Sequence, residues 1–180
     1  MTEEIIIAGF GGQGVLSMGK IMAYSAVMQD MEVSWMPSYG PEMRGGTANV
    51  IVIISSERIS SPIIRNFDTA IILNQQSLDK FEGSVKPGGI LIYDSNGITR
   101  HPERKDIDIY RIDAAEEAGR MNSPKTFNMI VLGGYLKIKP IIKLENVIKG
   151  LKKSLPERYH NLIPVNEKAL ERGIEIIRKV

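Results

Sequence analysis

The sequence of 180 residues contains no cysteine and only two histidines, His101 and His160. Without cysteine the chain cannot form disulfides, use a thiol nucleophile, or bind an iron–sulfur cluster or a zinc ion through thiolates. Neither histidine lies close to another histidine in the sequence, so we predict no metal site. No nucleophile is paired with a base in any recognisable motif, and we therefore expect no catalytic residue in this chain.

Aromatic residues are also scarce, at 6%, and no apolar run is long enough to span a bilayer. The net charge is only +2, and no stretch combines clustered Lys and Arg with aromatic residues, which argues against nucleic acid as a partner. The first residues, MTEEIII, carry acids where a signal peptide has a basic segment. These absences predict a cytoplasmic protein that binds neither nucleic acid nor a membrane.

What the sequence does contain is an alternation of apolar strands and helical patterns. The predicted strands are residues 4–8, 32–36, 47–55, 67–74, 86–94 and 107–112. The predicted helices of this half are residues 15–29 and 77–81. Such alternation indicates an α/β fold, with a Rossmann-like, mostly parallel sheet and helices on both faces. We expect residues 1–180 to form a single domain.

Several element boundaries are predicted from single residues. Pro37 should close the second strand, and residues 107–112 should form an edge strand because charged residues interrupt them. Residues 58–62 are predicted to pair with the preceding strand as a short hairpin arm. The C-terminal portion should be helical, with a buried helix at residues 127–136 and a charged helix at residues 166–180 that Asn166 caps.

The first turn of the chain, GFGGQG at residues 9–14, is the first candidate site. Its glycines fit the G-x-G-x-x-G spacing, with a strand before it and a helix after it. In this motif the glycines allow a sharp turn, a close approach to a ligand, and close packing of helix on strand. The amides at the start of such a helix attract anions. The anion-binding candidates are Gly9, Gly11, Gly12, Gln13 and Gly14.

Two other interpretations of this turn stay open. Dinucleotide binding requires an acidic residue near the end of the second strand, but that strand ends at Trp35 and Met36, and Glu32 begins it. The NAD fingerprint is therefore incomplete. Alternatively, the glycines serve only to pack helix on strand or to admit the backbone of a partner. Gln13 accordingly either donates to a phosphate or caps the turn.

A second loop, PSYGPEMRGG at residues 37–46, combines two prolines and three glycines with side chains suited to recognition. Arg44 is a further anion-binding candidate because its guanidinium can hold a phosphate or carboxylate by two parallel bonds. The structural alternative is a local ion pair between Glu42 and Arg44, which contributes little on a surface. The residues predicted to face an interface or an active site are Ser38, Tyr39, Glu42, Arg44, Gly45, Gly46 and Asn128.

Three stretches, GFGGQGVLSMGK, PSYGPEMRGGTANVIVIIS and SPKTFNMIVLGG, together resemble the gamma subunit of the 2-oxoacid:ferredoxin oxidoreductases. The sequence RGGTAN resembles the corresponding stretch of the 2-oxoglutarate and branched-chain (ketoisovalerate) branch of that family. The resemblance covers nearly the whole chain, including NEKALERG near the end. It implies oxidative decarboxylation of a 2-oxoacid with coenzyme A, which yields an acyl-CoA, carbon dioxide and reduced ferredoxin.

The resemblance implies a subunit rather than a complete enzyme. It assigns thiamine diphosphate, magnesium and iron–sulfur clusters to alpha, beta and delta-type partner subunits, and it makes the contact with ferredoxin indirect. The expected contribution of this chain is a subunit interface and an entrance for coenzyme A at the glycine turn and Arg44. The alternative is a free-standing Rossmann-like nucleotide-binding protein or reductase. Because these loops are expected to be exposed, we also expect that the isolated chain can form a homodimer.

Overall fold

The computed structural model describes residues 1–38 and 47–180. Its strands form one sheet in the order β2-β3-β1-β4-β5-β6-β7. The strands are β1 (Thr2–Phe10), β2 (Glu32–Ser38), β3 (Thr47–Ser55), β4 (Phe67–Ile72), β5 (Val85–Asp94), β6 (Asp108–Ile112) and β7 (Arg178–Lys179). The helices are α1 (Val15–Val27), α2 (Gln75–Phe81), α3 (Ala114–Arg120), α4 (Phe127–Ile138), α5 (Leu144–Ser154) and α6 (Ile163–Ile176). Short 3-10 turns are η2 (Glu82–Ser84), η3 (Ser95–Gly97), η4 (Pro124–Thr126) and η5 (Glu157–Leu162).

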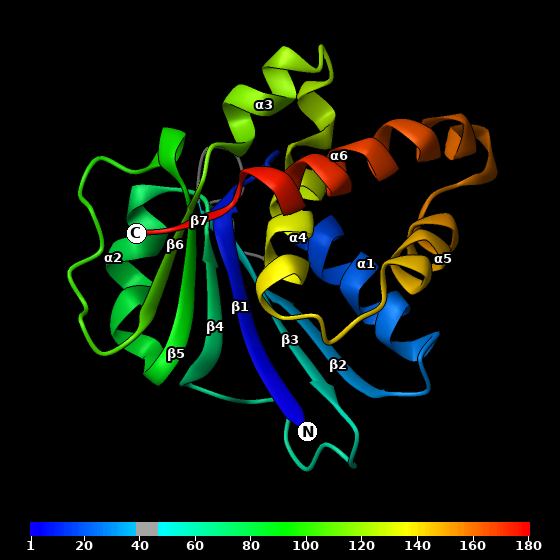
Figure 1. The fold of residues 1–180 in the computed structure, drawn as a ribbon. Coiled ribbons are helices and arrows are strands. Elements are labelled where there is room, and N and C mark those ends of the chain that lie inside the picture. Colours follow the sequence, from blue (N-terminus) through cyan, green and yellow to red (C-terminus); the bar gives the residue numbers. More distant parts are fainter. Residues whose placement is uncertain (39–46) are drawn as a thin grey trace.

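The sheet is mostly parallel, as predicted. β1, β4, β5 and β6 are parallel to one another, and β2 runs in the same direction because β3 lies antiparallel between β2 and β1. Only β3 and β7 run the opposite way. The predicted α/β class with a helical C-terminal portion is therefore confirmed (Figure 1).

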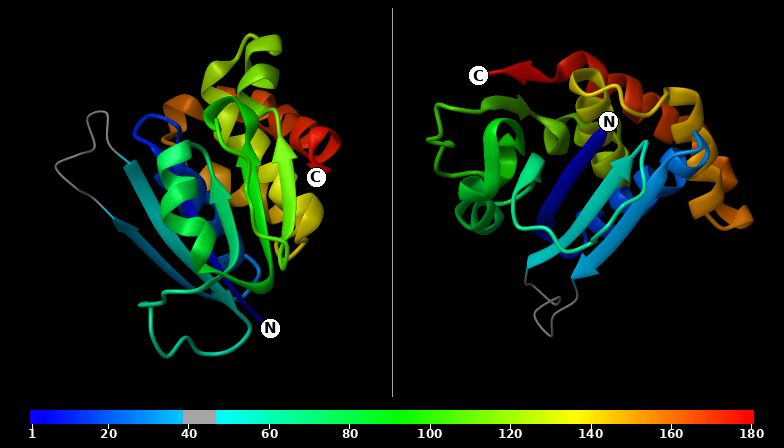
Figure 2. Two further views of the ribbon diagram at one scale, coloured as in Figure 1. Left: turned by 90° about the vertical axis from the view of Figure 1, so that its left-hand side faces the viewer. Right: turned by 90° about the horizontal axis from the view of Figure 1, so that it is seen from below.

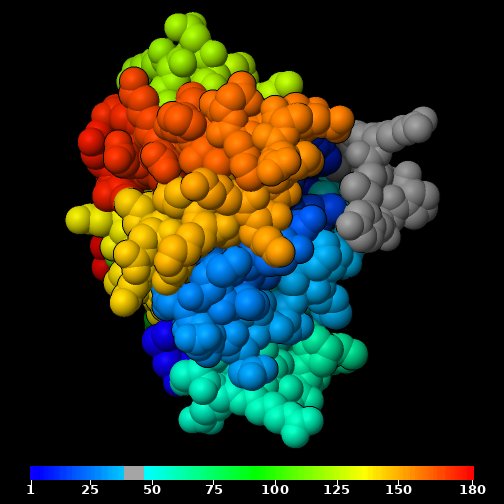
Figure 3. Space-filling model, turned by 90° about the vertical axis from the view of Figure 1, so that its right-hand side faces the viewer, coloured from blue at the N-terminus to red at the C-terminus, as the bar shows by residue number. Residues whose placement is uncertain are grey.

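Helices cover both faces of the sheet, but unequally (Figure 2). The alternating residues Ile5 and Ile7 of β1 face a large core shared with α1, α4, α5 and α6. Ile6 and Ala8 face a smaller core, to which α2 contributes Leu78. Because β1 is covered on both sides, its three consecutive isoleucines are all buried. Figure 3 shows the larger helical layer, where α1, α5 and α6 form one continuous surface.

Two predictions about strands are wrong, and in both cases the outcome depends on which strands lie beside them in the sheet. β2 does not end at Pro37 but continues to Ser38, paired with Asn49 of β3. Proline is tolerated there because β2 is an edge strand and needs no amide on its open side. β6 is not an edge strand, because the end of the chain returns as β7 and pairs with it.

The predicted hairpin arm at residues 58–62 is also wrong, since residues 56–66 contain no strand. Both sides of β3 are already occupied, with Ser55 opposite Thr2 of β1 and opposite Glu32 of β2. No free edge of β3 remains for a third partner, so the segment runs as a loop to β4.

The last helix begins earlier than predicted. α6 starts at Ile163, with Pro164 in its first turn, a position where the missing amide of proline carries no penalty. Asn166 is not the cap, because its side-chain amide donates to the carbonyl of Leu162 at 2.8 Å from within the helix. The helix ends at Ile176, and the basic residues beyond it form β7.

α4 and α6 cross with their backbones almost in contact. A methyl group added at Gly133 would lie 2.0 Å from the carbonyl oxygen of Leu170, and one added at Gly173 would lie 1.9 Å from that of Ile130. α4 is buried along most of its length, as its apolar sequence predicted. This crossing attaches the C-terminal helical portion to the rest of the fold.

Glu82 holds the loop that leads from η3 to β6. Its carboxylate accepts a bond from the guanidinium of Arg100 at 3.0 Å, and further bonds from the backbone amides of Glu103 and Arg104. Burial opposes ionisation of Glu82, but these donors outweigh it, and the pKa of Glu82 lies below its ordinary value of 4.5. The ionised carboxylate therefore stabilises the folded state.

We expect Glu82→Gln to lower the free energy of unfolding at pH 7 by about 1.5–3 kcal/mol, the typical contribution of hydrogen bonds to a charged group. Because the pKa is lowered on folding, this contribution is complete above the unfolded value and is lost as the pH falls through the folded value. Urea titrations at pH 7 and pH 3 should show the difference between wild type and variant shrinking at low pH. Glu57→Gln, at an exposed side chain far from this loop, is the control. An equal Glu82→Gln difference at both pH values would contradict this role.

Candidate functional site

The glycine turn lies at the carboxyl edge of the sheet, between β1 and α1 (Figure 1). β1 and β4 are parallel neighbours at this point, and the chain continues from β1 to one side of the sheet and from β4 to the other. Open α/β sheets bind ligands at such a topological switch point. The turn is therefore the place where this fold is expected to carry a site.

Residues 10–13 form a β-turn closed by a bond from the Gln13 amide to the carbonyl of Phe10, at 3.2 Å. Gly12 occupies the third position with φ of 93°, which favours glycine in a type II turn. The side chain of Gln13 is committed to the same turn. Its Oε1 accepts the Phe10 amide at 2.6 Å, and its Nε2 donates to the carbonyl of Leu73 at 3.1 Å. Gln13 thus caps the turn, and a phosphate could use its amide only by breaking a bond.

The glycines of the turn differ in what surrounds them. A methyl group at Gly9 would lie 2.8 Å from Cβ of Leu73, and one at Gly14 would lie 2.6 Å from Nδ2 of Asn128. Packing within the chain therefore explains why positions 9 and 14 are glycine. At the exposed Gly12, no described atom lies within 4 Å of an added methyl group. The space that a ligand or partner can approach is over Gly12.

Asn128 reaches this turn from the first turn of α4. Its Nδ2 donates to the carbonyl oxygen of Gly14 at 3.3 Å. The same carbonyl accepts the first helical bond of α1, from the Met18 amide at 2.9 Å. The amides of the preceding residues 15–17 have no acceptor within the described part of the chain. They form the anion-attracting end of α1.

The second loop begins and ends where the glycine turn lies, at the carboxyl ends of the parallel strands. Ser38 is exposed at the end of β2, and Thr47, at the start of β3, pairs with Phe10 of β1. Tyr39, Glu42, Arg44, Gly45 and Gly46 lie outside the described residues. The strands that precede the two loops, β1 and β2, are not neighbours, because β3 lies between them. The two loops nevertheless leave the sheet at one edge.

Two polar residues at this edge were not predicted as functional. Asn74, after β4, accepts the Ser77 amide at 2.8 Å and so caps α2. Asp94, at the end of β5, accepts the amides of Ala114 at 2.9 Å and Ala115 at 3.2 Å, which begin α3. Burial raises the pKa of Asp94 above its ordinary value. The sequence signal for both residues was a polar side chain at the end of a buried strand. It could not show that Asp94 caps α3, because that helix begins 20 residues further along the chain.

The chain supplies few groups for a metal or cluster. Residues 1–38 and 47–180 contain no cluster of three His, Asp or Glu side chains that could hold a metal ion. Because the sequence has no cysteine, its residues do not fit an iron–sulfur cluster held by thiolates. In the same two ranges, none of the helices has the length and apolar character needed to cross a membrane.

Comparison with known proteins gives one consistent family. The profile of the family described as "Pyruvate ferredoxin/flavodoxin oxidoreductase" matches residues 4–176. Over 98% of its length the chain is 36% identical to ketoisovalerate oxidoreductase subunit VorA of Methanothermobacter marburgensis, and it spans 37% of that protein. It is also 31% identical to 2-oxoglutarate synthase subunit KorC of Methanocaldococcus jannaschii, over the whole chain and 96% of that protein.

Solved structures show the same fold. The gamma subunit of a keto/oxoacid ferredoxin oxidoreductase from Geobacter sulfurreducens superposes with a TM-score of 0.84 at 28% identity, over 98% of this chain and 96% of that one. The 2-oxoglutarate:ferredoxin oxidoreductase of Magnetococcus marinus, solved with 2-oxoglutarate, coenzyme A and succinyl-CoA bound, gives 0.86 at 25% identity. There the match covers 96% of this chain but only 30% of the other. The matched region thus occurs both as a separate chain and as about a third of a longer one.

Proposed function

Because the chain belongs to the pyruvate ferredoxin/flavodoxin oxidoreductase family, we propose that it is the gamma subunit of a multi-subunit 2-oxoacid:ferredoxin oxidoreductase in the cytoplasm. Residues 1–180 act in it as one gamma-type domain. The complex oxidatively decarboxylates 2-oxoglutarate or a branched-chain 2-oxoacid with coenzyme A, and ferredoxin accepts the electrons. Similarity to KorC and to the Geobacter gamma subunit over nearly their whole lengths supports this assignment.

In this proposal the redox chemistry belongs to partner subunits. Thiamine diphosphate with magnesium, on the alpha and beta subunits, supplies the electron sink for decarboxylation, and iron–sulfur clusters pass electrons to ferredoxin. The donor groups of this chain support that division, because it offers no thiolate. The residues of this chain would bind coenzyme A and contact the partner subunits.

The observation that supports a coenzyme A role is the space over Gly12, which no described atom fills, beside the amides at the start of α1, which have no acceptor among the described residues. A phosphate group suits such amides, and Arg44 complements them by two parallel hydrogen bonds. Coenzyme A and succinyl-CoA are bound in the Magnetococcus enzyme, whose structure this chain resembles.

The same edge also suits a subunit interface. Phe10, within the turn, is 38% exposed, so its aromatic ring is available to a partner at this place. Tyr39 and Arg44 belong to the residue types that most often anchor interfaces. In VorA the matching region is joined to further chain that makes up most of that protein. Such fusion supports close contact between this domain and another part of the oxidoreductase.

Arg44→Ala in the assembled complex separates the two roles. If Arg44 binds coenzyme A, we expect the KM for coenzyme A to rise about tenfold, the loss of one charge-assisted contact, with the complex intact. If Arg44 anchors the interface, the complex should dissociate on size-exclusion chromatography. Arg58→Ala, in the exposed loop at the opposite edge of the sheet, is the control. An intact complex with an unchanged KM would exclude both roles for Arg44.

Purification of the tagged chain from its host tests the assembly itself. We expect recovery of thiamine-binding and iron–sulfur subunits, with 2-oxoacid-dependent reduction of a dye. A panel of 2-oxoacids on this material then distinguishes 2-oxoglutarate from the branched-chain substrate. Recovery of the chain alone, without such activity, would favour the free-standing nucleotide-binding alternative, which the family match does not favour.

A further inference from the structure

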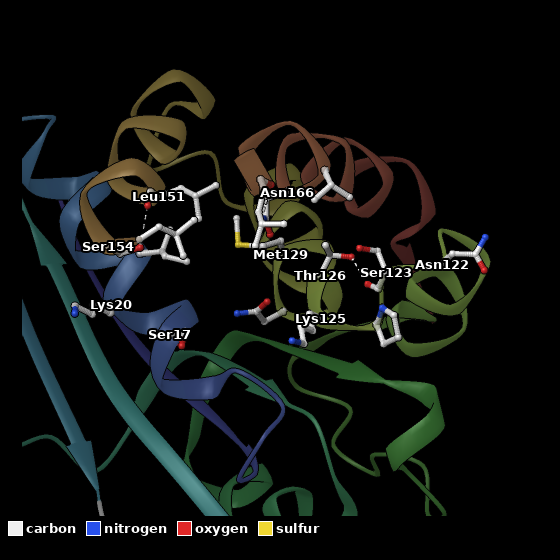
Figure 4. Close-up of a pocket in the computed structure, with 16 residues that line it drawn as sticks. Ser17, Lys20, Asn122, Ser123, Lys125, Thr126, Met129, Leu151, Ser154 and Asn166 are labelled. Carbon is white, nitrogen blue, oxygen red and sulfur yellow. Dashed lines mark hydrogen bonds between the residues drawn. The ribbon is translucent and has the colours of Figure 1, made fainter. Parts of the chain in front are cut away.

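A cavity of about 640 Å³ opens among α1, α4, α5 and α6, on the helical side of the molecule (Figure 4). Asn128 lines it and also contacts Gly14, but no residue of the glycine turn lines it. The cavity therefore adjoins the candidate site, with which it shares Ser17 and Asn128, and it extends from there between the helices. Its volume lies within the range of small-molecule sites, which are mostly apolar with a few placed polar groups.

The cavity has an apolar wall. Its aliphatic lining residues are Ile21, Met129, Leu151, Leu155, Leu162 and Val165. Several of its polar side chains already donate to nearby backbone carbonyls. The hydroxyl of Thr126 donates to the Ser123 carbonyl at 2.7 Å, and that of Ser154 donates to the Leu151 carbonyl at 3.1 Å.

The charged lining is of one sign. Lys20 and Lys125 are among the residues that line the cavity, and none of the described lining residues is Asp or Glu. Neither ammonium group has an ion-pair partner among the described residues. Figure 4 shows Lys125 beside Ser17 at one side of the cavity, whereas the ammonium group of Lys20 points away from the cavity and lies 5.7 Å from the centroid of the Tyr24 ring. Lys125, which pairs with no carboxylate of the described residues, therefore favours an anionic ligand.

We propose that this cavity binds an aliphatic carboxylate, with the alkyl chain on the apolar wall and the carboxylate at Lys125. A nucleotide fits less well, since the described lining residues include no aromatic side chain to stack on a base and no acidic side chain to accept ribose hydroxyls. This ligand site is additional to the role proposed for the glycine turn.

Calorimetric titration of the full chain with octanoate tests the proposal. We expect saturable one-to-one binding, and an affinity that rises about fourfold per methylene from butanoate to octanoate, as burial of each group predicts. Octanol, which lacks the charge, should bind more weakly than octanoate. Inorganic phosphate and coenzyme A should not compete. Tighter binding of phosphate or coenzyme A than of octanoate, or affinity independent of chain length, would overturn the assignment.

Matched variants locate the binding. Lys125→Gln should weaken octanoate binding about tenfold and leave octanol binding unchanged, because it removes the charge and not the apolar wall. Lys105→Gln, which removes another exposed lysine far from the cavity, should change neither. Val165→Phe, at a half-buried lining position, should block both ligands by filling the space, with circular dichroism as the check of folding. Equal octanoate affinity in wild type and Lys125→Gln would show that the cavity is not the site.

Discussion

Gly173→Ala is expected to destabilise the protein by about 3 kcal/mol, the upper end of the usual cost of overpacking. Alanine is the better helix former by about 1 kcal/mol, so propensity alone predicts the opposite sign. Packing prevails because the added methyl group meets backbone and not a flexible side chain. It would lie 1.9 Å from the carbonyl oxygen of Ile130 and 2.8 Å from its carbon, so α4 and α6 must separate.

Gly119→Ala provides the matched control for this prediction. Gly119 also lies in a helix, α3, but no described atom is within 4 Å of an added methyl group. Here propensity acts unopposed, and we expect stabilisation of up to about 1 kcal/mol. Urea denaturation measures both variants at one pH. Shifts of the same sign would show that the α4–α6 contact tolerates a wider separation than the structure implies.

Gly12→Ala is expected to lower the activity of the assembled oxidoreductase at least about tenfold, equivalent to about 1.4 kcal/mol of transition-state or docking free energy. The side chain would enter the open space over the turn, where we propose that coenzyme A or a partner subunit approaches. The chain itself should stay folded, because left-handed backbone costs alanine only about 1–2 kcal/mol.

Gly88→Ala separates backbone strain from loss of the site. Gly88 also has a positive φ, of 75°, and no described atom near an added methyl group, but it lies near the start of β5, away from the turn. Both variants should lose similar thermal stability, and only Gly12→Ala should lose activity. Equal activities of the two variants in the complex would mean that nothing approaches the turn at Gly12, and would leave the subunit assignment to the purification experiment.

Much of the fold was predictable because it is encoded locally. Three consecutive isoleucines made β1 recognisable as a strand covered on both faces. The apolar pattern of α4 predicted a buried helix, and burial follows along most of it. The order of strands and helices was sufficient for the α/β class. The glycine turn was found by spacing and context, and the family by its motifs.

Errors arose where the outcome depended on a partner strand. The length of β2 beyond Pro37 depends on its being an edge strand, and the absence of a hairpin arm depends on β3 having two neighbours already. β7 pairs with β6 although about 70 residues separate them, so no local pattern announces it. Strand pairing is a long-range property, and the periodicity of a segment does not encode it.

By itself, therefore, the sequence determined the fold class, the family, and the position of a glycine turn between strand and helix. Only the tertiary structure decided what each glycine does. Gly9 faces Leu73 and Gln13, Gly14 faces Asn128, and no described atom lies within 4 Å of a methyl group added at Gly12. The contacts behind this distinction are long-range: Gln13 and Leu73 are 60 positions apart in the sequence, and Gly14 and Asn128 are 114 positions apart. The spacing of a motif specifies local backbone geometry, whereas the neighbours of that backbone are set by the packing of the whole chain.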